Sequence, residues 1–239
     1  RGLGDVYKRQ LVNIVWACNN LVIERLVMSN ILVYLLDGKI YINLTNRCTN
    51  DCIFCLRKDK DDVVGQTLWL DDENSTAQDV IKQFEVKRNE LLSTNLPFTE
   101  VIFCGYGEPM LKFDVLKQVA EYIKKQYPKT KIRVNTNGHA NYVYKKNIVP
   151  ECKGLIDEFS VSLNGATKEE YDELSQPKFA QAYEEVKNFI KACSDEKISV
   201  VASVVEGYKG RHLDLKKCEE IANNLGAKFR VREWIKNGY

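Results

Sequence analysis

The chain has 239 residues, of which 44% are apolar, and its 35 Lys and Arg residues nearly balance 33 Asp and Glu residues, which gives a net charge of +2. This length permits one large α/β domain or two small ones, and the apolar fraction is enough to bury a sizeable core. A chain so close to neutrality has no overall electrostatic attraction to nucleic acid or to a membrane, so we expect neither as a partner.

The first part of the chain predicts neither a membrane anchor nor a secretion signal. Residues 11–36 are apolar but interrupted by polar side chains, so no run is long enough to span a bilayer, and no small-residue cleavage site follows. Met28 begins a segment that leads into the first expected strand. We therefore expect residues 1–27 to be a non-native or disordered extension and residues 28–239 to form one core domain. The eight cysteines are too few for a disulfide scaffold and indicate a reducing, cytoplasmic location.

Strand-like and helix-like segments alternate along the rest of the chain. The strands are expected at residues 39–45, 98–104, 131–135, 157–163, 198–204 and 228–233. Apolar residues at helical spacing predict helices between them, and we expect Asp71 or Asp72 to cap the first of these helices. The charged residues 57–62 are expected to form a solvated loop. This alternation predicts an α/β domain whose strands are parallel and whose helices lie outside the sheet.

One face of several expected strands is polar, whereas a closed barrel normally fills its interior with branched apolar side chains. The polar positions are Asn43, Thr45, Arg133, Asn135, Asn137, Ser160, Ser162, Asn164, Ser199, Ser203, Lys228, Arg230 and Arg232. We interpret this face as the lining of a wet cavity that holds a cofactor and a substrate. An antiparallel sheet with one solvent face is the alternative, which the helices between the strands disfavour.

Three cysteines, Cys48, Cys52 and Cys55, lie in a C-x₃-C-x₂-C arrangement directly after the first strand. One loop can therefore bring three thiolates to one centre, which suits zinc or an iron–sulfur cluster. Structural zinc usually takes four ligands in two pairs, and the only histidines, His139 and His212, do not form a ligand-like pair. A [4Fe–4S] cluster normally takes four cysteines, so three would leave one iron open. The spacing favours the cluster and leaves zinc as the alternative.

With Phe54 directly before the last cysteine, this motif resembles that of the radical S-adenosylmethionine (SAM) superfamily. The stretch from Tyr41 to Lys58 more narrowly resembles the radical SAM proteins named for their association with TatD-type nucleases. The resemblance implies a [4Fe–4S] cluster on the three cysteines and SAM on the open iron. It also implies a reducing electron donor, cleavage of SAM to a 5′-deoxyadenosyl radical, and hydrogen abstraction from a substrate. A genomic association with a TatD-type hydrolase is a further expectation.

The superfamily's core is an open partial (β/α)6 TIM-like barrel with parallel strands. Such a barrel reconciles the polar strand faces with the helices between the strands, and we expect it here. Ligands would then bind at the carboxyl ends of the strands, where the motifs of this chain fall.

The second motif, Gly105 to Pro109, follows the second expected strand. Glycines permit close backbone approach, and the carboxylate of Glu108 can bind an ammonium group. Alone, this segment would indicate a strand-to-helix turn with a glutamate at the helix start. It resembles the GGEP motif of the superfamily, which implies that Gly105, Gly107 and Glu108 bind the amino group of SAM. Tyr106 departs from that motif's glycine pattern.

Further site residues follow from the resemblance. Asn135 is expected to contact the ribose or carboxylate of SAM, although it also belongs to a turn-forming sequence. Ser162 occupies a matching inward place on the next strand, and Phe54 is expected beside the adenine. Cys104 is interpreted as a buried structural thiol, and His139 as a surface turn residue.

The row Lys228, Arg230 and Arg232 has a period of two, which places three cations on one strand face. Facing the cavity they would suit a phosphate or carboxylate, and at an exposed edge they would discourage aggregation. We leave both interpretations open.

The sequence therefore predicts a radical SAM enzyme whose catalytic residues and substrate are unknown. The substrate is expected to be a small molecule or a partner protein. Two alternatives remain, namely an activase for a glycyl-radical partner protein and a non-enzymatic zinc-binding module.

Overall fold

The computed structural model describes residues 30–60, 62–63 and 65–234, so the expectation for residues 1–27 lies outside the described residues. Its main feature is a seven-stranded sheet with the order β1-β2-β5-β6-β7-β8-β9. The strands of this sheet are β1 (Val33–Leu36), β2 (Lys39–Ile42), β5 (Glu100–Phe103), β6 (Lys131–Thr136), β7 (Glu158–Ser162), β8 (Ser199–Glu206) and β9 (Lys228–Glu233). From β2 to β9 every neighbouring pair is parallel, which confirms the predicted parallel α/β architecture.

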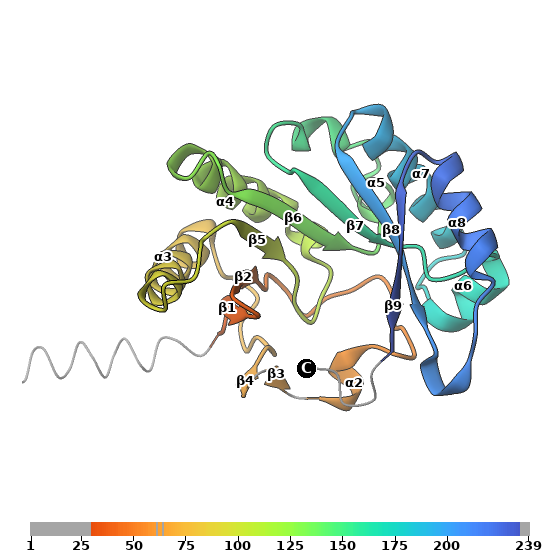
Figure 1. Ribbon diagram of the computed structural model, residues 1–239, viewed down its shortest axis with the longest axis horizontal. Helices are drawn as coiled ribbons and strands as arrows, with labels where there is room; N and C mark the ends of the chain where they lie inside the picture. Colours follow the sequence, from red (N-terminus) through yellow and green to blue (C-terminus); the bar gives the residue numbers. More distant parts are fainter. Residues whose placement is uncertain (1–29, 61, 64, 235–239) are drawn as a thin grey trace, which may run out of the picture.

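Helices connect these strands and cover one side of the curved sheet (Figure 1). They are α3 (Ala77–Ser93), α4 (Phe113–Gln126), α5 (Ala140–Tyr144), α6 (Lys168–Ser175), α7 (Ala182–Asp195) and α8 (Leu215–Asn224). Short 3₁₀ segments lie at Pro109–Lys112, Val149–Cys152 and Tyr208–Gly210. The other side of the sheet faces the short helix α2 (Leu56–Asp59) and a small hairpin of β3 (Asp62–Val63) and β4 (Gln66–Thr67). Within the described residues β1 and β9 do not pair, so the barrel is open.

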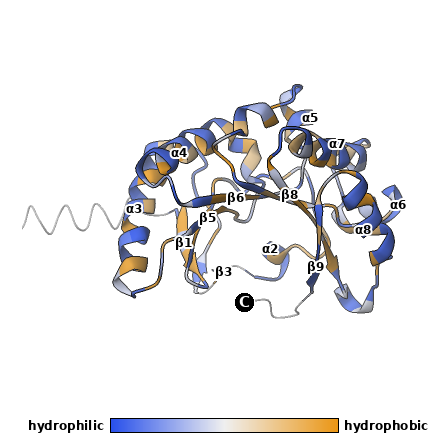
Figure 2. Ribbon diagram, turned by 45° about the horizontal axis from the view of Figure 1, so that its top comes forward, coloured by the Kyte–Doolittle hydropathy of each residue, from blue (hydrophilic) through white to orange (hydrophobic). Residues whose placement is uncertain are grey.

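The main core lies between the sheet and the outer helices. Ile132, Val134, Phe159 and Val161 alternate with polar residues along β6 and β7, and all four are completely buried in this core. Figure 2 shows the hydrophobic residues of the outer helices turned toward the sheet. The period of two along each strand therefore leaves the polar residues on the opposite, inner side, as the sequence predicted.

A smaller apolar cluster covers part of the inner side near β1 and β2. Tyr34, Val63, Leu68 and Tyr106 are buried there, with Trp69 packed against them. This cluster joins the β3–β4 hairpin to the loop that follows β5. No helix of the described ranges combines the length and apolar character needed to cross a bilayer.

Two local features differ from the sequence-based expectations. The strand β1 was not predicted, although Asp37 and Gly38, which form its turn to β2 with positive φ angles, are a typical hairpin pair. The prediction that Asp71 or Asp72 caps the first long helix is wrong, because Thr76 is the N-cap of α3. Thr76 and Asp79 satisfy each other's backbone amides in a capping box, which Asp71 and Asp72, five and four positions earlier, cannot do.

Candidate functional site

The cysteine loop leaves the carboxyl end of β2 and rests on the end of α6. The amide of Asp51 donates to the carbonyls of Ser175 and Gln176, both at 3.1 Å. The amide of Ile53 donates to the carbonyl of Leu174 at 3.0 Å. The amide of Lys178 in turn donates to the carbonyl of Thr49 at 3.0 Å. Backbone hydrogen bonds on both sides of the loop therefore fix its path, as if it were a short strand.

The three predicted metal ligands, Cys48, Cys52 and Cys55, are free, partly buried thiols. Burial is the main cause that raises the pKa of Cys48 and raises that of Cys52 to about 12, and the neighbouring cysteines add to both shifts. Without a bound cation the thiols of Cys48 and Cys52 are therefore protonated at neutral pH. Cysteine binds metal as the thiolate, so metal binding here would release protons.

Arg57 fastens the cysteine loop to the glycine motif. Its Nη1 donates to the carbonyls of Asn46 at 3.0 Å and Tyr106 at 3.3 Å, and its Nη2 to the carbonyl of Asn50 at 3.5 Å. The side chain is only 14% exposed. The assignment of residues 57–62 to a solvated loop is therefore wrong, because residues 57–59 belong to helix α2 and Asp62 to strand β3, and the guanidinium of Arg57 is turned inward.

Gly105 and Gly107 bring the loop after β5 into contact with the segment that precedes the cysteines. A Cβ atom at Gly105 would lie 2.0 Å from Oδ1 of Asn43, and one at Gly107 would lie 2.2 Å from the carbonyl oxygen of Thr45. Both distances are far below van der Waals contact, so neither position accepts a side chain without movement. The two glycines thus allow the loop after β5 to pack closely against residues 43–47, directly before the first cysteine.

Glu108 joins the same loop to the end of β6. Its Oε1 accepts hydrogen bonds from the amide of Met110 at 3.0 Å and from Thr136 Oγ1 at 2.7 Å, and its Oε2 accepts one from the amide of Asn137 at 2.7 Å. Burial raises the pKa of this carboxyl to about 7, against the opposing effect of the three donors. An ionised carboxylate has roughly four acceptor positions, so one remains for a ligand's ammonium group.

The inner face of the sheet carries the predicted polar residues. Asn135 pairs in register with Ser160, and not with Ser162 as expected. Ser162 lies two residues nearer the carboxyl end of β7, on the same side of the strand as Ser160. The Oδ1 atom of Asn135 is buried without a hydrogen-bond partner among the described residues. Cys104 lies beside Asn135, whose side chain lowers the pKa of this thiol against the larger raising effect of burial. An acceptor in this position can bind a hydroxyl or amino group of a ligand.

The three cations of β9, Lys228, Arg230 and Arg232, differ in their exposure to solvent. Arg230 is partly buried, and its Nη2 donates to Ser160 Oγ at 2.7 Å, two strands away across the inner face. Lys228 and Arg232 are exposed. Arg230 therefore contacts the inner side of the sheet, while Lys228 and Arg232 are exposed, and both interpretations of the row stay predictions.

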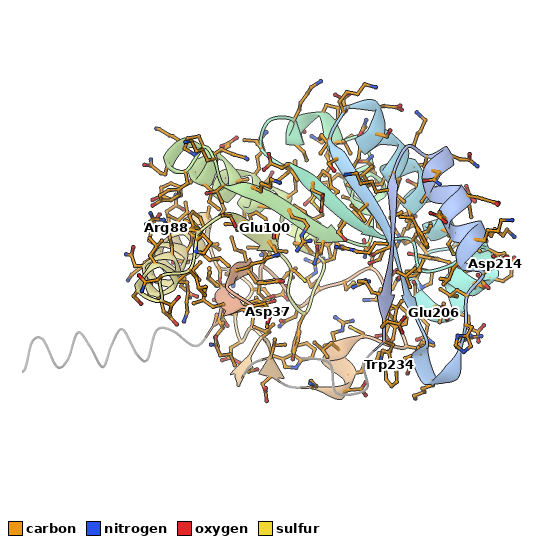
Figure 3. The ribbon with its side chains drawn as sticks, in the orientation of Figure 1. Asp37, Arg88, Glu100, Glu206, Asp214 and Trp234 are labelled. Atoms are coloured by element: carbon orange, nitrogen blue, oxygen red, sulfur yellow. The ribbon has the colours of Figure 1, made fainter. Side chains whose placement is uncertain are left out.

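Three aromatic residues gather beside the cysteine loop. Phe54 contacts the ring of Tyr208 edge-on at 6.0 Å, and Tyr208 contacts Trp234 in the same way at 5.1 Å. The Tyr208 hydroxyl donates to the carbonyl of Ile53 at 2.8 Å. Figure 3 shows Trp234 near Glu206, and the amide of Trp234 donates to the Glu206 carbonyl at 2.8 Å. Sequence reasoning missed Tyr208 and Trp234, because isolated aromatic residues in loops carry no distinguishing pattern.

The interpretation of His139 as a surface residue is wrong, because the side chain is only 1% exposed. It lies behind the cysteine loop between Thr49 and Tyr171, with which both ring nitrogens form hydrogen bonds. Its local sequence, Asn137-Gly138-His139, signals a turn. The burial comes from segments far away in the chain and has no local signal.

The donor chemistry of the site fits an iron–sulfur cluster. In the part of the chain that the structure describes, no three His, Cys, Asp or Glu side chains converge as the ligands of a single metal ion would. A four-iron cluster is larger than one ion, and its cysteines bind different irons, so its ligands need not converge on one point. Three free thiols from one loop can therefore each bind a different iron of one cluster.

The fold and the site together define an α/β-barrel protein that places a three-thiol loop and a buried carboxylate at the carboxyl ends of parallel strands. A family model described as the radical SAM superfamily matches residues 42–232. The chain therefore belongs to the radical SAM superfamily.

Solved structures of similar fold include SuiB of Streptococcus suis. The complex of SuiB with S-adenosylmethionine has a TM-score of 0.59 and 17% identity, covering 82% of this chain and 40% of that chain. The structure of SuiB bound to the precursor peptide SuiA has a TM-score of 0.58 and 17% identity, covering 82% and 39% respectively. The structure of native anSMEcpe with bound AdoMet has a TM-score of 0.55 and 12% identity, covering 82% and 50%. At these identities the comparison concerns the fold alone.

An uncharacterized protein of Methanocaldococcus jannaschii, MJ0907, is similar in sequence, with 24% identity over 133 residues. The match covers 55% of this chain and 41% of that protein. The chain thus spans about half or less of the length of the relatives that it matches.

Proposed function

We propose that Cys48, Cys52 and Cys55 bind three irons of a [4Fe–4S] cluster and that SAM occupies the fourth. When bound, the cluster supplies the electron that cleaves the sulfonium of SAM to a 5′-deoxyadenosyl radical, which abstracts hydrogen from a substrate. One observation carries this proposal. Three free thiols lie in one loop, and Gly107 packs against the backbone carbonyls of Thr45 and Arg47, directly before the first of these cysteines.

The residues around the cysteine loop take distinct roles in this proposal. Glu108 and the backbone at Gly105 and Gly107 bind the amino group of SAM, for which the carboxylate keeps one acceptor position. Asn135 presents its unpartnered Oδ1 toward a ligand hydroxyl, and Ser162 lines the interior one position further along. Phe54, supported by Tyr208, provides an aromatic surface for the adenine.

We propose a peptide or a partner protein as substrate, with a small molecule as the alternative. Two of the similar folds were solved with peptides, SuiB with its precursor peptide SuiA and anSMEcpe with a Cp18Cys peptide. β1 and β9 do not pair within the described residues, and an open barrel of this kind would suit access of an extended chain to the inner face. A reducing electron donor, a cytoplasmic setting for the free thiols and a genomic association with a TatD-type hydrolase complete the proposal.

The test is anaerobic reconstitution of the full chain with iron and sulfide, followed by dithionite and SAM. We expect a brown protein with about four irons and four sulfides per chain that produces 5′-deoxyadenosine. A colourless protein that binds zinc tightly and takes up no iron would contradict the proposal and favour a zinc-binding module. A protein that takes up the cluster but cleaves no SAM, even with a peptide mixture added, would limit the site to cluster binding.

A further inference from the structure

A continuous set of buried hydrogen bonds lies behind the cysteine loop, on residues to which the proposed function gives no role. His139 lies between two hydroxyl groups, with Nδ1 2.8 Å from Thr49 Oγ1 and Nε2 2.9 Å from the Tyr171 hydroxyl. Nδ2 of Asn50 donates to the same Tyr171 hydroxyl at 3.1 Å. Because Thr49 and Asn50 both belong to the cysteine loop, the network holds that loop at two consecutive residues.

Asn137 connects this network to a cysteine sulfur. Its Oδ1 accepts a hydrogen bond from the amide of His139 at 3.1 Å, which identifies the oxygen end of the carboxamide. The two hydrogens on its Nδ2 then point to Thr49 Oγ1 at 2.7 Å and to Cys48 Sγ at 3.6 Å. The amide of Asn50 lies 3.5 Å from the same sulfur. Cys48 thus receives two N–H groups, one of them from a side chain whose position depends on the network.

Burial lowers the pKa of His139 to about 4, so at neutral pH the ring is neutral and has one donor and one acceptor nitrogen. Both neighbours of the ring are hydroxyl groups, which can donate or accept, so each ring nitrogen has a hydrogen-bond partner. The side-chain nitrogen of Asn50 can only donate, so the Tyr171 hydroxyl accepts a hydrogen bond from it.

We propose that Asn137 sets how readily a cluster bound to Cys48 accepts an electron, and that Thr49, His139 and Tyr171 are positioning residues for its carboxamide. An N–H group directed at a cluster sulfur stabilises the more negatively charged reduced state and so raises the reduction potential. A donor that is itself held by a buried network keeps its direction. This inference rests on the proposed function, because it requires a cluster on Cys48, but it concerns the reduction potential and not the cleavage of SAM.

The first test is a redox titration of the anaerobically reconstituted full chain without SAM, followed by electron paramagnetic resonance. Asn137→Asp keeps the acceptor for the His139 amide and replaces the donor to Cys48 with a carboxylate oxygen of the same shape. We expect its midpoint potential to become more negative at unchanged iron content. Thr49→Val removes the acceptor that orients the carboxamide and is expected to shift the potential less, in the same direction. Thr49→Ser restores the hydroxyl and is expected to restore the wild-type potential.

Two buried tyrosines provide a matched control. Tyr171→Phe removes the hydroxyl that contacts His139, whereas Tyr183→Phe removes one that donates to the Gly165 carbonyl at 3.3 Å, away from the cysteine loop. We expect a more negative potential only in Tyr171→Phe.

Unchanged potentials in both Asn137→Asp and Thr49→Val, at full iron content, would overturn the inference. If Asn137→Asp takes up no iron, the Thr49 pair decides: a shift in Thr49→Val that is absent in Thr49→Ser supports the inference, and equal potentials overturn it. A wild-type chain that takes up no iron contradicts the proposed function itself, and this is recognised before any variant is compared.

Discussion

The two flanks of the barrel interior differ in how completely their side chains are held. Beside the cysteine loop, Glu108 accepts three hydrogen bonds and Arg57 donates to three carbonyls. Along β9, Lys228 is exposed, and Arg230 donates a hydrogen bond to Ser160 Oγ. A preorganised site holds its groups in place before the ligand arrives. The comparison indicates that the flank beside the cysteine loop is preformed, while Lys228 and Arg230 on the flank of β9 are held by fewer contacts.

The largest expected effect comes from removing a proposed metal ligand. Cys52→Ala leaves two thiols in the loop, so we expect loss of the cluster and of 5′-deoxyadenosine formation. The measurement is iron content together with product analysis after anaerobic reconstitution. Cys218→Ala is the matched control, because Cys218 is a fully buried cysteine on α8, and it should retain both. Equal iron content in the two variants would show that Cys52 is not a ligand.

The next effect tests whether the cofactor flank is tightly packed. Gly107→Ala would place a Cβ against the carbonyl oxygens of Thr45 at 2.2 Å and Arg47 at 2.6 Å, so backbone must move. We expect a loss of about 3 kcal/mol in the free energy of unfolding. The control is Gly154→Ala, which has a positive φ of 78° but no atom within 4 Å, and should lose only about 1 kcal/mol. Urea unfolding of the cluster-free protein measures both, and equal losses would argue against a tight contact at Gly107.

A smaller effect should follow pH through Glu108. Burial raises the pKa of its carboxyl from the ordinary 4.5 to about 7, so the folded protein binds more protons than the unfolded chain between these values. The contribution of Glu108 to stability is therefore present below about pH 4.5 and is lost as the pH rises toward 7. We expect wild-type protein to lose stability relative to Glu108→Gln over this range, as measured by urea unfolding at several pH values. Parallel pH profiles for the two proteins would contradict the shift.

The smallest effect distinguishes the two kinds of cation on β9. Arg230→Gln removes a partly buried hydrogen bond to Ser160 and should cost about 1 kcal/mol of folding stability. Lys228→Gln changes an exposed side chain on the same strand and should stay within about 0.5 kcal/mol of wild type. Thermal and urea unfolding of both variants provide the measurement. A larger loss for Lys228→Gln than for Arg230→Gln would reverse the assignment of the inward residue.

The sequence predicted the features that depend on local patterns. Alternation along residues 131–135 and 157–163 identified strands with one apolar face, and the spacing of the cysteines and glycines identified the loops at their ends. Two local signals were present but not used, namely Asp37-Gly38 for the β1–β2 hairpin and Thr76 with Asp79 for the cap of α3. The hairpin turn and the helix cap could therefore have been predicted from the local sequence alone.

Other features depend on contacts between distant segments and have no local signal. His139 is buried because Thr49, 90 residues away, and Tyr171, 32 residues away, close over it. Arg57 lies in a charged stretch that indicates solvent exposure, yet its guanidinium satisfies the carbonyls of Asn46 and Tyr106. In both cases tertiary packing decides which polar side chain is inside.

If Cys48, Cys52 and Cys55 bind three irons of a four-iron cluster, the fourth iron is open for SAM. Electron–nuclear double resonance on the reduced, reconstituted chain, with SAM that carries ¹⁷O in its carboxylate, would detect SAM on that iron. We expect a coupling between the labelled oxygen and the cluster, and we expect Glu108→Gln to weaken the binding of SAM that produces it. A cluster that assembles fully but shows no coupling at saturating SAM would contradict the binding of SAM to that iron.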